Sequence, residues 1–170
     1  NNADVRLYET AKSYKDLKIY GRTDKDASWE LIYDQKNTGQ NISFRAFSAD
    51  NRIVYFSKSE KEGPDGLYAY NFDSKDFKLV VRDKTVDPGR VMASPDNDAV
   101  YAVRFNDGYP RYEVIDKANP MVKDLAKLQN AFPDTDIIPV SSTKDGRKVV
   151  YVVRSDTQAG DYYLFDRDSQ

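Results

Sequence analysis

The sequence predicts an all-β protein: a partial β-propeller of four-stranded antiparallel blades with one inserted amphipathic helix. The composition is the first observation, because 13 Tyr and 8 Phe, together with many Val and Ile, favour pleated strands. Abundant Asp, Asn and Ser favour tight turns. The second observation is a repeat of strand, turn and strand, whose turn residues Asp50, Asp96 and Asp145 lie 46 and 49 positions apart. Units of 40–50 residues with several short strands are typical of propeller blades.

The first unit, residues 5–34, is predicted to be a partial blade. Strands are expected over 5–8, 17–20 and 29–33, which correspond to the second, third and fourth strands of the repeat. Alternating apolar and polar residues and the polar stretches between them support this assignment.

The second unit, residues 41–81, is predicted to be a complete blade. The Asp50-Asn51 turn joins the first two strands, and a Gly-Pro-Asp-Gly loop precedes the third. Asp-Asn and Asp-Gly turns between apolar runs are strong hairpin signals. The four strands are expected over 42–48, 53–56, 67–73 and 77–81.

The third unit, residues 89–132, is predicted to be a blade plus a helix. Its strands are expected over 90–94, 99–103 and 111–116. Asn119-Pro120 then opens a helix as N-cap and first helical residue. The apolar residues recur at helical spacing and are Met121, Val122, Leu125, Leu128 and Phe132. The helix is expected to bury this stripe on the flank of the blades; the alternative is a contact surface for a second domain.

The fourth unit, residues 136–167, is predicted to be a blade that lacks its last strand, with strands over 137–142, 149–153 and 162–166. Because the repeat starts and stops in mid-blade, we expect a piece of a larger propeller with apolar flanks that self-associates. Two alternatives stay open: a small ring closed by the N-terminal strand, and an ordinary antiparallel sandwich.

The composition excludes several kinds of chemistry. The chain has no His and no Cys, so His-based triads, thiol catalysis and Cys or His metal sites are absent. No Gly-x-Ser-x-Gly elbow and no phosphate-binding glycine loop occurs. A net charge of −2 argues against nucleic-acid and membrane partners. We therefore predict no catalytic, cofactor-binding or metal-binding residues and no cofactor.

Two groups of residues could nevertheless carry a function. Carboxylates spaced two apart resemble the start of a calcium loop, but none continues into the full pattern, so we expect solvated turn residues at Asp24, Asp26, Asp96, Asp98, Asp134 and Asp136. Tyr55, Tyr101 and Tyr151 fall at equivalent places after the turns and either line a channel or, as we expect, pack between blades.

The repeats resemble those of periplasmic TolB-like proteins and of the prolyl oligopeptidase family. Ser94-Pro95-Asp96-Asn97 and Thr143-Lys144-Asp145-Gly146 carry this likeness. The stretch from Tyr112 to Asp166, about a third of the chain, looks like the propeller of bacterial prolyl-oligopeptidase-family hydrolases.

This resemblance implies a propeller that gates access of small peptide or acyl substrates to a C-terminal α/β-hydrolase domain of the same parent chain. It implies that the chain itself is not catalytic, since none of the triad can be placed on it. The alternatives are a TolB-like protein-interaction propeller without a hydrolase, and a carbohydrate-active propeller. The lack of Cys is compatible with either the periplasm or the cytoplasm of a bacterium.

Overall fold

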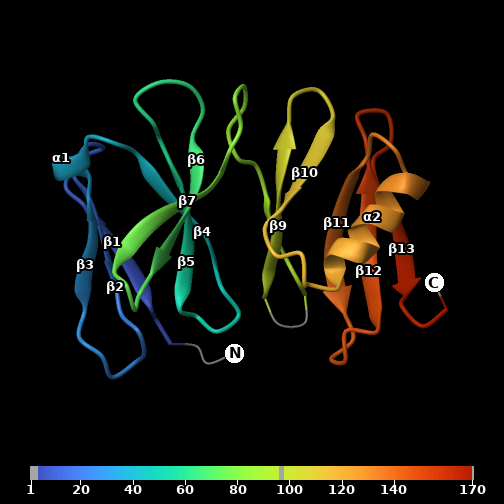
Figure 1. Ribbon diagram of the computed structural model, residues 1–170, viewed down its shortest axis with the longest axis horizontal. Helices are drawn as coiled ribbons and strands as arrows, with labels where there is room; N and C mark the ends of the chain where they lie inside the picture. Colours follow the sequence, from blue (N-terminus) through green and yellow to red (C-terminus); the bar gives the residue numbers. More distant parts are fainter. Residues whose placement is uncertain (1–3, 96–97, 170) are drawn as a thin grey trace.

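The computed structural model describes residues 4–95 and 98–169 as four antiparallel sheets that stand side by side (Figure 1). We call these sheets blades 1 to 4. In every blade the strands follow one another in chain order, each paired with its sequence neighbour. The described strands β1 and β13 pair only with β2 and β12, so these blades form an open arc rather than the closed ring that was one alternative.

Blades 1 and 2 form the N-terminal half. Blade 1 consists of β1 (Leu7–Ala11), β2 (Leu17–Gly21) and β3 (Glu30–Asp34), followed by the short helix α1 (Gln35–Thr38). Blade 2 has four strands, β4 (Ile42–Phe47), β5 (Ile53–Lys58), β6 (Gly66–Asn71) and β7 (Asp76–Arg82). Helix α1 was not predicted. Asp34 caps it through the N–H of Lys36, and Gly39 ends it with a φ of 68°.

Blades 3 and 4 form the C-terminal half. Blade 3 consists of β8 (Val91–Ala93), β9 (Val100–Asn106) and β10 (Pro110–Val114), and helix α2 (Met121–Ala131) follows it. Blade 4 consists of β11 (Asp136–Ser142), β12 (Lys148–Arg154) and β13 (Asp161–Asp166). The predicted helix is thus present. It begins at Met121, one residue later than expected, with Pro120 rather than Asn119 at the N-cap position. The side chain of Asn119 nevertheless accepts a hydrogen bond from the N–H of Met121 at 3.0 Å.

The repeated turn has the same backbone closure in three blades. The N–H groups of Ser48, Ser94 and Thr143 donate to the carbonyls of Ile53, Ala99 and Lys148 at 2.9, 3.0 and 2.9 Å. In blade 2 the carboxylate of Asp50 accepts from the hydroxyl of Ser48 and the N–H of Arg52. Asp145 does the same for Thr143 and Arg147 in blade 4. Asp96 lies outside the described residues.

This closure corrects the predicted equivalence of the three tyrosines. Equivalent positions are found by counting from the residue whose carbonyl accepts this bond. Tyr55 and Tyr101 each follow that residue by two positions, whereas Tyr151 follows it by three and so corresponds to Phe56. Successive strand residues point to opposite faces, so Tyr151 packs toward the preceding blade instead of the following one. All three rings are buried between blades, at 8%, 0% and 0% exposure, as expected.

The hydrophobic core lies between the blades and has three parts. The first fills the space between blades 1 and 2 and includes Ile19, Val54 and Phe56. The second lies between blades 2 and 3 around Leu67 and Phe105. The third joins blades 3 and 4 to the apolar stripe of α2, so the helix is a cap on the blade flank, as expected. Among the described residues, no helix is long and apolar enough to cross a membrane.

Candidate functional site

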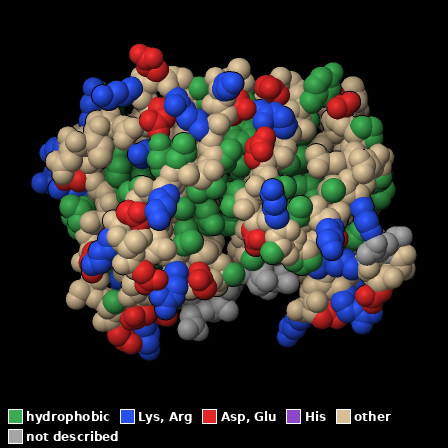
Figure 2. Space-filling view, viewed as in Figure 1, with side chains coloured by type: hydrophobic (Ala, Val, Ile, Leu, Met, Phe, Trp, Pro, Cys, Tyr) green, Lys and Arg blue, Asp and Glu red, His purple; other side chains and the backbone are tan. Residues whose placement is uncertain are grey.

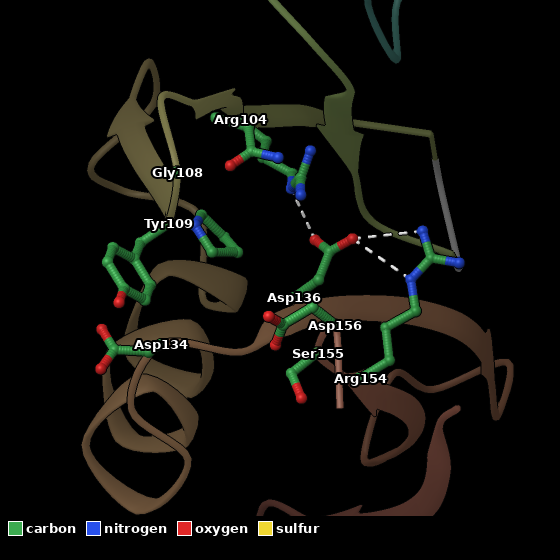
Figure 3. Close-up of a pocket in the computed structure, with 10 residues that line it drawn as sticks. Arg104, Gly108, Tyr109, Asp134, Asp136, Arg154, Ser155 and Asp156 are labelled. Atoms are coloured by element: carbon green, nitrogen blue, oxygen red, sulfur yellow. Dashed lines mark hydrogen bonds and ion pairs between the residues drawn. The ribbon is translucent and has the colours of Figure 1, made fainter. Parts of the chain in front are cut away.

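A polar pocket of about 270 Å³ opens between blades 3 and 4 (Figure 3). The ends of β9 and β12, the start of β11 and the loop between β9 and β10 form its walls. Charged groups dominate the lining, which comprises Arg104, Asn106, Gly108, Tyr109, Pro110, Asp134, Asp136, Arg154, Ser155 and Asp156. The sequence patterns had singled out only Asp134 and Asp136 among these residues.

Asp136 lies at the centre of the pocket and is shared by two guanidinium groups. Its Oδ1 lies 2.7 Å from Nε of Arg104, and its Oδ2 lies 3.2 Å from Nη2 of Arg154. The residue is 6% exposed, which corrects the expectation of a solvated turn residue. The physical reason is position: the strand β11 begins at Asp136 and places it at the junction with blade 3, where a buried carboxylate requires charge partners.

Arg104 reaches the pocket from blade 3 and is mostly buried, with 19% of its side chain exposed. Its Nε–H is not directed at a hydrogen-bond acceptor among the described residues, so its contact with Asp136 is an ion pair rather than a hydrogen bond. Arg154 belongs to blade 4 and is half exposed at the pocket mouth. The Arg104–Asp136 pair therefore joins two blades, while Arg154 stabilises the carboxylate from within its own blade.

Tyr112 on β10 strengthens the same junction. Its hydroxyl accepts a hydrogen bond from the N–H of Ile137 at 2.8 Å and donates to Oδ1 of Asp136 at 3.3 Å. Burial raises the pKa of Tyr112 to about 12, and the nearby negative charge of Asp136 acts in the same direction. The hydroxyl therefore keeps its proton at neutral pH and serves as a fixed donor between blades 3 and 4.

The other described carboxylates of the predicted pairs are exposed, namely Asp24, Asp26, Asp98 and Asp134. Asp24 accepts from the N–H groups of Asp26 and Ala27 at 2.9 Å each, a local turn interaction that holds the pKa of its carboxyl below the ordinary value. Asp98 and Asp134 adopt positive φ values of 57° and 60°. No group of three or more Asp or Glu suited to a metal ion occurs among the residues that the structure describes.

A second buried carboxylate, that of Asp124, lies on the buried side of α2. Asp124 accepts from Nε of Arg167 at 2.6 Å and from the hydroxyl of Tyr151 at 3.4 Å. Burial, followed by the charge of Asp124, raises the pKa of Tyr151 well above its ordinary value. This interaction joins the helix to the end of blade 4. Asp124 could have been suspected from sequence, because it stands within the apolar stripe of the helix between Met121 and Leu125.

No protein-family model and no curated protein sequence matches this chain. Solved structures do. TolB from Acinetobacter baumannii matches 96% of this chain with a TM-score of 0.54 and 18% identity. A prolyl endopeptidase matches 97% of it with a TM-score of 0.54 and 14% identity. Both matches are to propeller domains. The chain is a partial β-propeller. It spans 38% of the TolB chain and 27% of the endopeptidase chain.

Proposed function

We propose that this partial propeller is the non-catalytic region of a serine hydrolase or peptidase and gates the access of small peptide or acyl substrates to a separate α/β-hydrolase domain. The observation that carries the proposal is the match of 97% of the chain to a prolyl endopeptidase, whose structure was described in terms of inter-domain dynamics in catalysis and specificity. The likeness of residues 112–166 to the propellers of that family supports the same assignment.

The proposed mechanism is steric. Blades held rigidly to one another exclude folded proteins, while motion between the propeller and the hydrolase domain admits short chains. The ion pair between Arg104 and Asp136 and the hydroxyl of Tyr112 fit this role, because both fix blade 4 against blade 3. In this mechanism the chain restricts access to the active site and packs against the hydrolase domain, and the catalytic residues belong to that other domain.

A second candidate function is a TolB-like protein-interaction propeller with no hydrolase attached. It is favoured by the match to TolB, which has the same TM-score of 0.54. In this function the pocket between Arg104 and Arg154 is a contact for polar groups of a partner chain. The half-exposed guanidinium of Arg154 and the exposed ring of Tyr109 lie at the pocket mouth.

The coding sequence that follows Gln170 separates the two functions. A reading frame that continues into Gly-x-Ser-x-Gly, then Asp, then His supports the gate. A reading frame that ends without these residues, or that leads into another interaction module, refutes the gate and favours the TolB-like function.

A second experiment tests gating directly in the parent protein. Since this chain has no Cys, a single engineered disulfide can tie its blades to the hydrolase domain. We expect the oxidised form to lose turnover of short peptides and the reduced form to regain it, with single-Cys variants as controls. Equal turnover in both redox states would contradict the gating mechanism.

A further inference from the structure

The outer face of blade 4 is an apolar surface at one end of the arc. Its exposed side chains come from β11 and from β13, the edge strand. Tyr162 is 74% exposed, Leu164 is 65% exposed and Val140 is 48% exposed. Leu164 pairs across strands with Val150, and Tyr162 pairs with Val152, so these four residues share one side of the sheet. A monomeric protein rarely leaves such a contiguous apolar surface in water.

The equivalent positions in blade 2 are buried against the next blade. The repeated turn makes Val150 equivalent to Tyr55, which is 8% exposed. The register of the following strand then makes Tyr162 equivalent to Leu67, which is 0% exposed and packs between blades 2 and 3. The outer face of blade 4 is thus a face of the type that meets a following blade.

The outer face of blade 1 is of the other type, the side of a blade that packs toward the preceding blade. Tyr8 stacks on Tyr20 with ring centroids 4.8 Å apart, and Trp29 meets Tyr8 edge-on at 4.6 Å. Leu31, opposite Tyr20 in the sheet, is 48% exposed. In blade 2 the side that packs toward the preceding blade also carries an aromatic group, formed by Phe56, Tyr70 and Phe77. Blade 1 therefore exposes a face of the type that meets a preceding blade.

We propose that these two faces form an interface between two copies of this chain, with blade 4 of one copy packed on blade 1 of the other. The second copy is the occupant because it supplies the matching face: a following-blade surface needs a preceding-blade surface, and the chain exposes one of each, at opposite ends of the arc (Figure 1). The net charge of −2 opposes this approach only weakly. The inference concerns this chain by itself and does not rest on the proposed function, in which further blades of a parent chain would compete for the same two faces.

This pairing is head to tail, so the two surfaces in contact differ from each other. Sedimentation velocity over a range of protein concentrations tests it. We expect the wild-type chain to associate as its concentration rises. Leu164→Glu and Leu31→Glu each place a charge in the interface and are expected to weaken association at least tenfold. Leu79→Glu is the matched control, because Leu79 is 53% exposed but lies on β7 of blade 2, away from both faces.

Mixing the two variants decides the geometry. Leu164→Glu retains an intact blade 1 face and Leu31→Glu retains an intact blade 4 face, so the mixture is expected to form heterodimers although each variant alone is monomeric. Circular dichroism verifies that all variants are folded. A wild-type chain that stays monomeric at every concentration overturns the proposal. So does a mixture that remains monomeric, or a control variant that loses association equally.

Discussion

The carboxylate of Asp136 joins blades 3 and 4, since the guanidinium of Arg104 and the phenol of Tyr112 face it from blade 3, while Arg154 faces it from its own blade. We predict that Asp136→Asn lowers the free energy of unfolding by about 3 kcal/mol, because it leaves the mostly buried guanidinium of Arg104 without a counter-charge. Urea denaturation measures this loss. Asp168→Asn, which removes an exposed partner of Arg147, is the control and should change the stability little. Similar losses for both variants would contradict the prediction.

Tyr112 gives the protein a specific dependence on alkaline pH. Its pKa is about 12 in the folded protein and about 10 when unfolded. Between these values the unfolded chain releases a proton that the folded chain retains, so the stability is fully present below pH 10 and falls as the pH rises toward 12. Burial raises the pKa of Tyr101 and Tyr151 as well, so they add to the effect.

We predict that Tyr112→Phe loses about 1 kcal/mol at pH 8, where the hydrogen bond from Ile137 is broken, and loses less further stability than the wild type between pH 8 and pH 11. Urea denaturation at both pH values measures the two slopes. Tyr14→Phe, at a position that is 83% exposed, serves as the control for removal of a hydroxyl at pH 8. An unchanged alkaline slope in Tyr112→Phe would show that its ionisation is not linked to folding.

Of the two described helices, α2 is the longer, and its apolar stripe packs it against blades 3 and 4. Leu125 is 2% exposed within this contact. We predict that Leu125→Ala lowers the free energy of unfolding by about 3 kcal/mol through lost burial and the cavity left behind. Lys123→Ala, on the exposed side of the same helix, should be neutral. Thermal or urea denaturation measures both, and a neutral Leu125→Ala would mean that the helix is not part of the cooperative unit.

Most strands and the longer helix could be predicted because local signals determine them: turn Asp residues, alternation, and the helical spacing around Leu125. The facing of Tyr151 was predicted wrongly, because Tyr151 stands one position further along its strand than Tyr55 and Tyr101 do, although the three turns have the same length. A shift of one position places a strand residue on the opposite face, and the hydrogen bond from Thr143 to Lys148 fixes the count. The bulge at Val140, where the register of β11 against β12 shifts, was not predicted either. Helix α1 is too short to produce a periodic pattern.

The pocket was largely inaccessible to sequence reasoning for a different reason. Arg104 and Asp136 belong to different blades and are separated in sequence by β10 and α2. No local pattern indicates that the packing of the two sheets brings Nε of Arg104 to 2.7 Å from Oδ1 of Asp136. The i, i+2 spacing did mark Asp134 and Asp136, but the same spacing also marked Asp24 and Asp26, which are exposed. What distinguishes Asp136 is burial, and burial depends on the arrangement of blades.

At the scale of the whole molecule, the arc exposes charged groups and apolar patches on the same surface (Figure 2), and its stability is expected to vary from the ends to the middle. Blades 2 and 3 are packed on both faces, whereas blades 1 and 4 each lack a neighbour on one face. Local unfolding begins where few apolar contacts hold a segment. In β1 four of the five residues are exposed, while in β9 five of seven are buried.

We therefore predict that amide hydrogen exchange is fastest in β1 and β13 and slowest in β5 and β9, as measured by exchange and mass spectrometry at low protein concentration. Raising the concentration should slow exchange in β1 and β13 alone, because the second copy then covers the end blades. Leu164→Glu provides the control, since it should keep the fast exchange of both end strands at every concentration. Slowest exchange in an end strand at low concentration would contradict the picture of an arc stabilised from its centre.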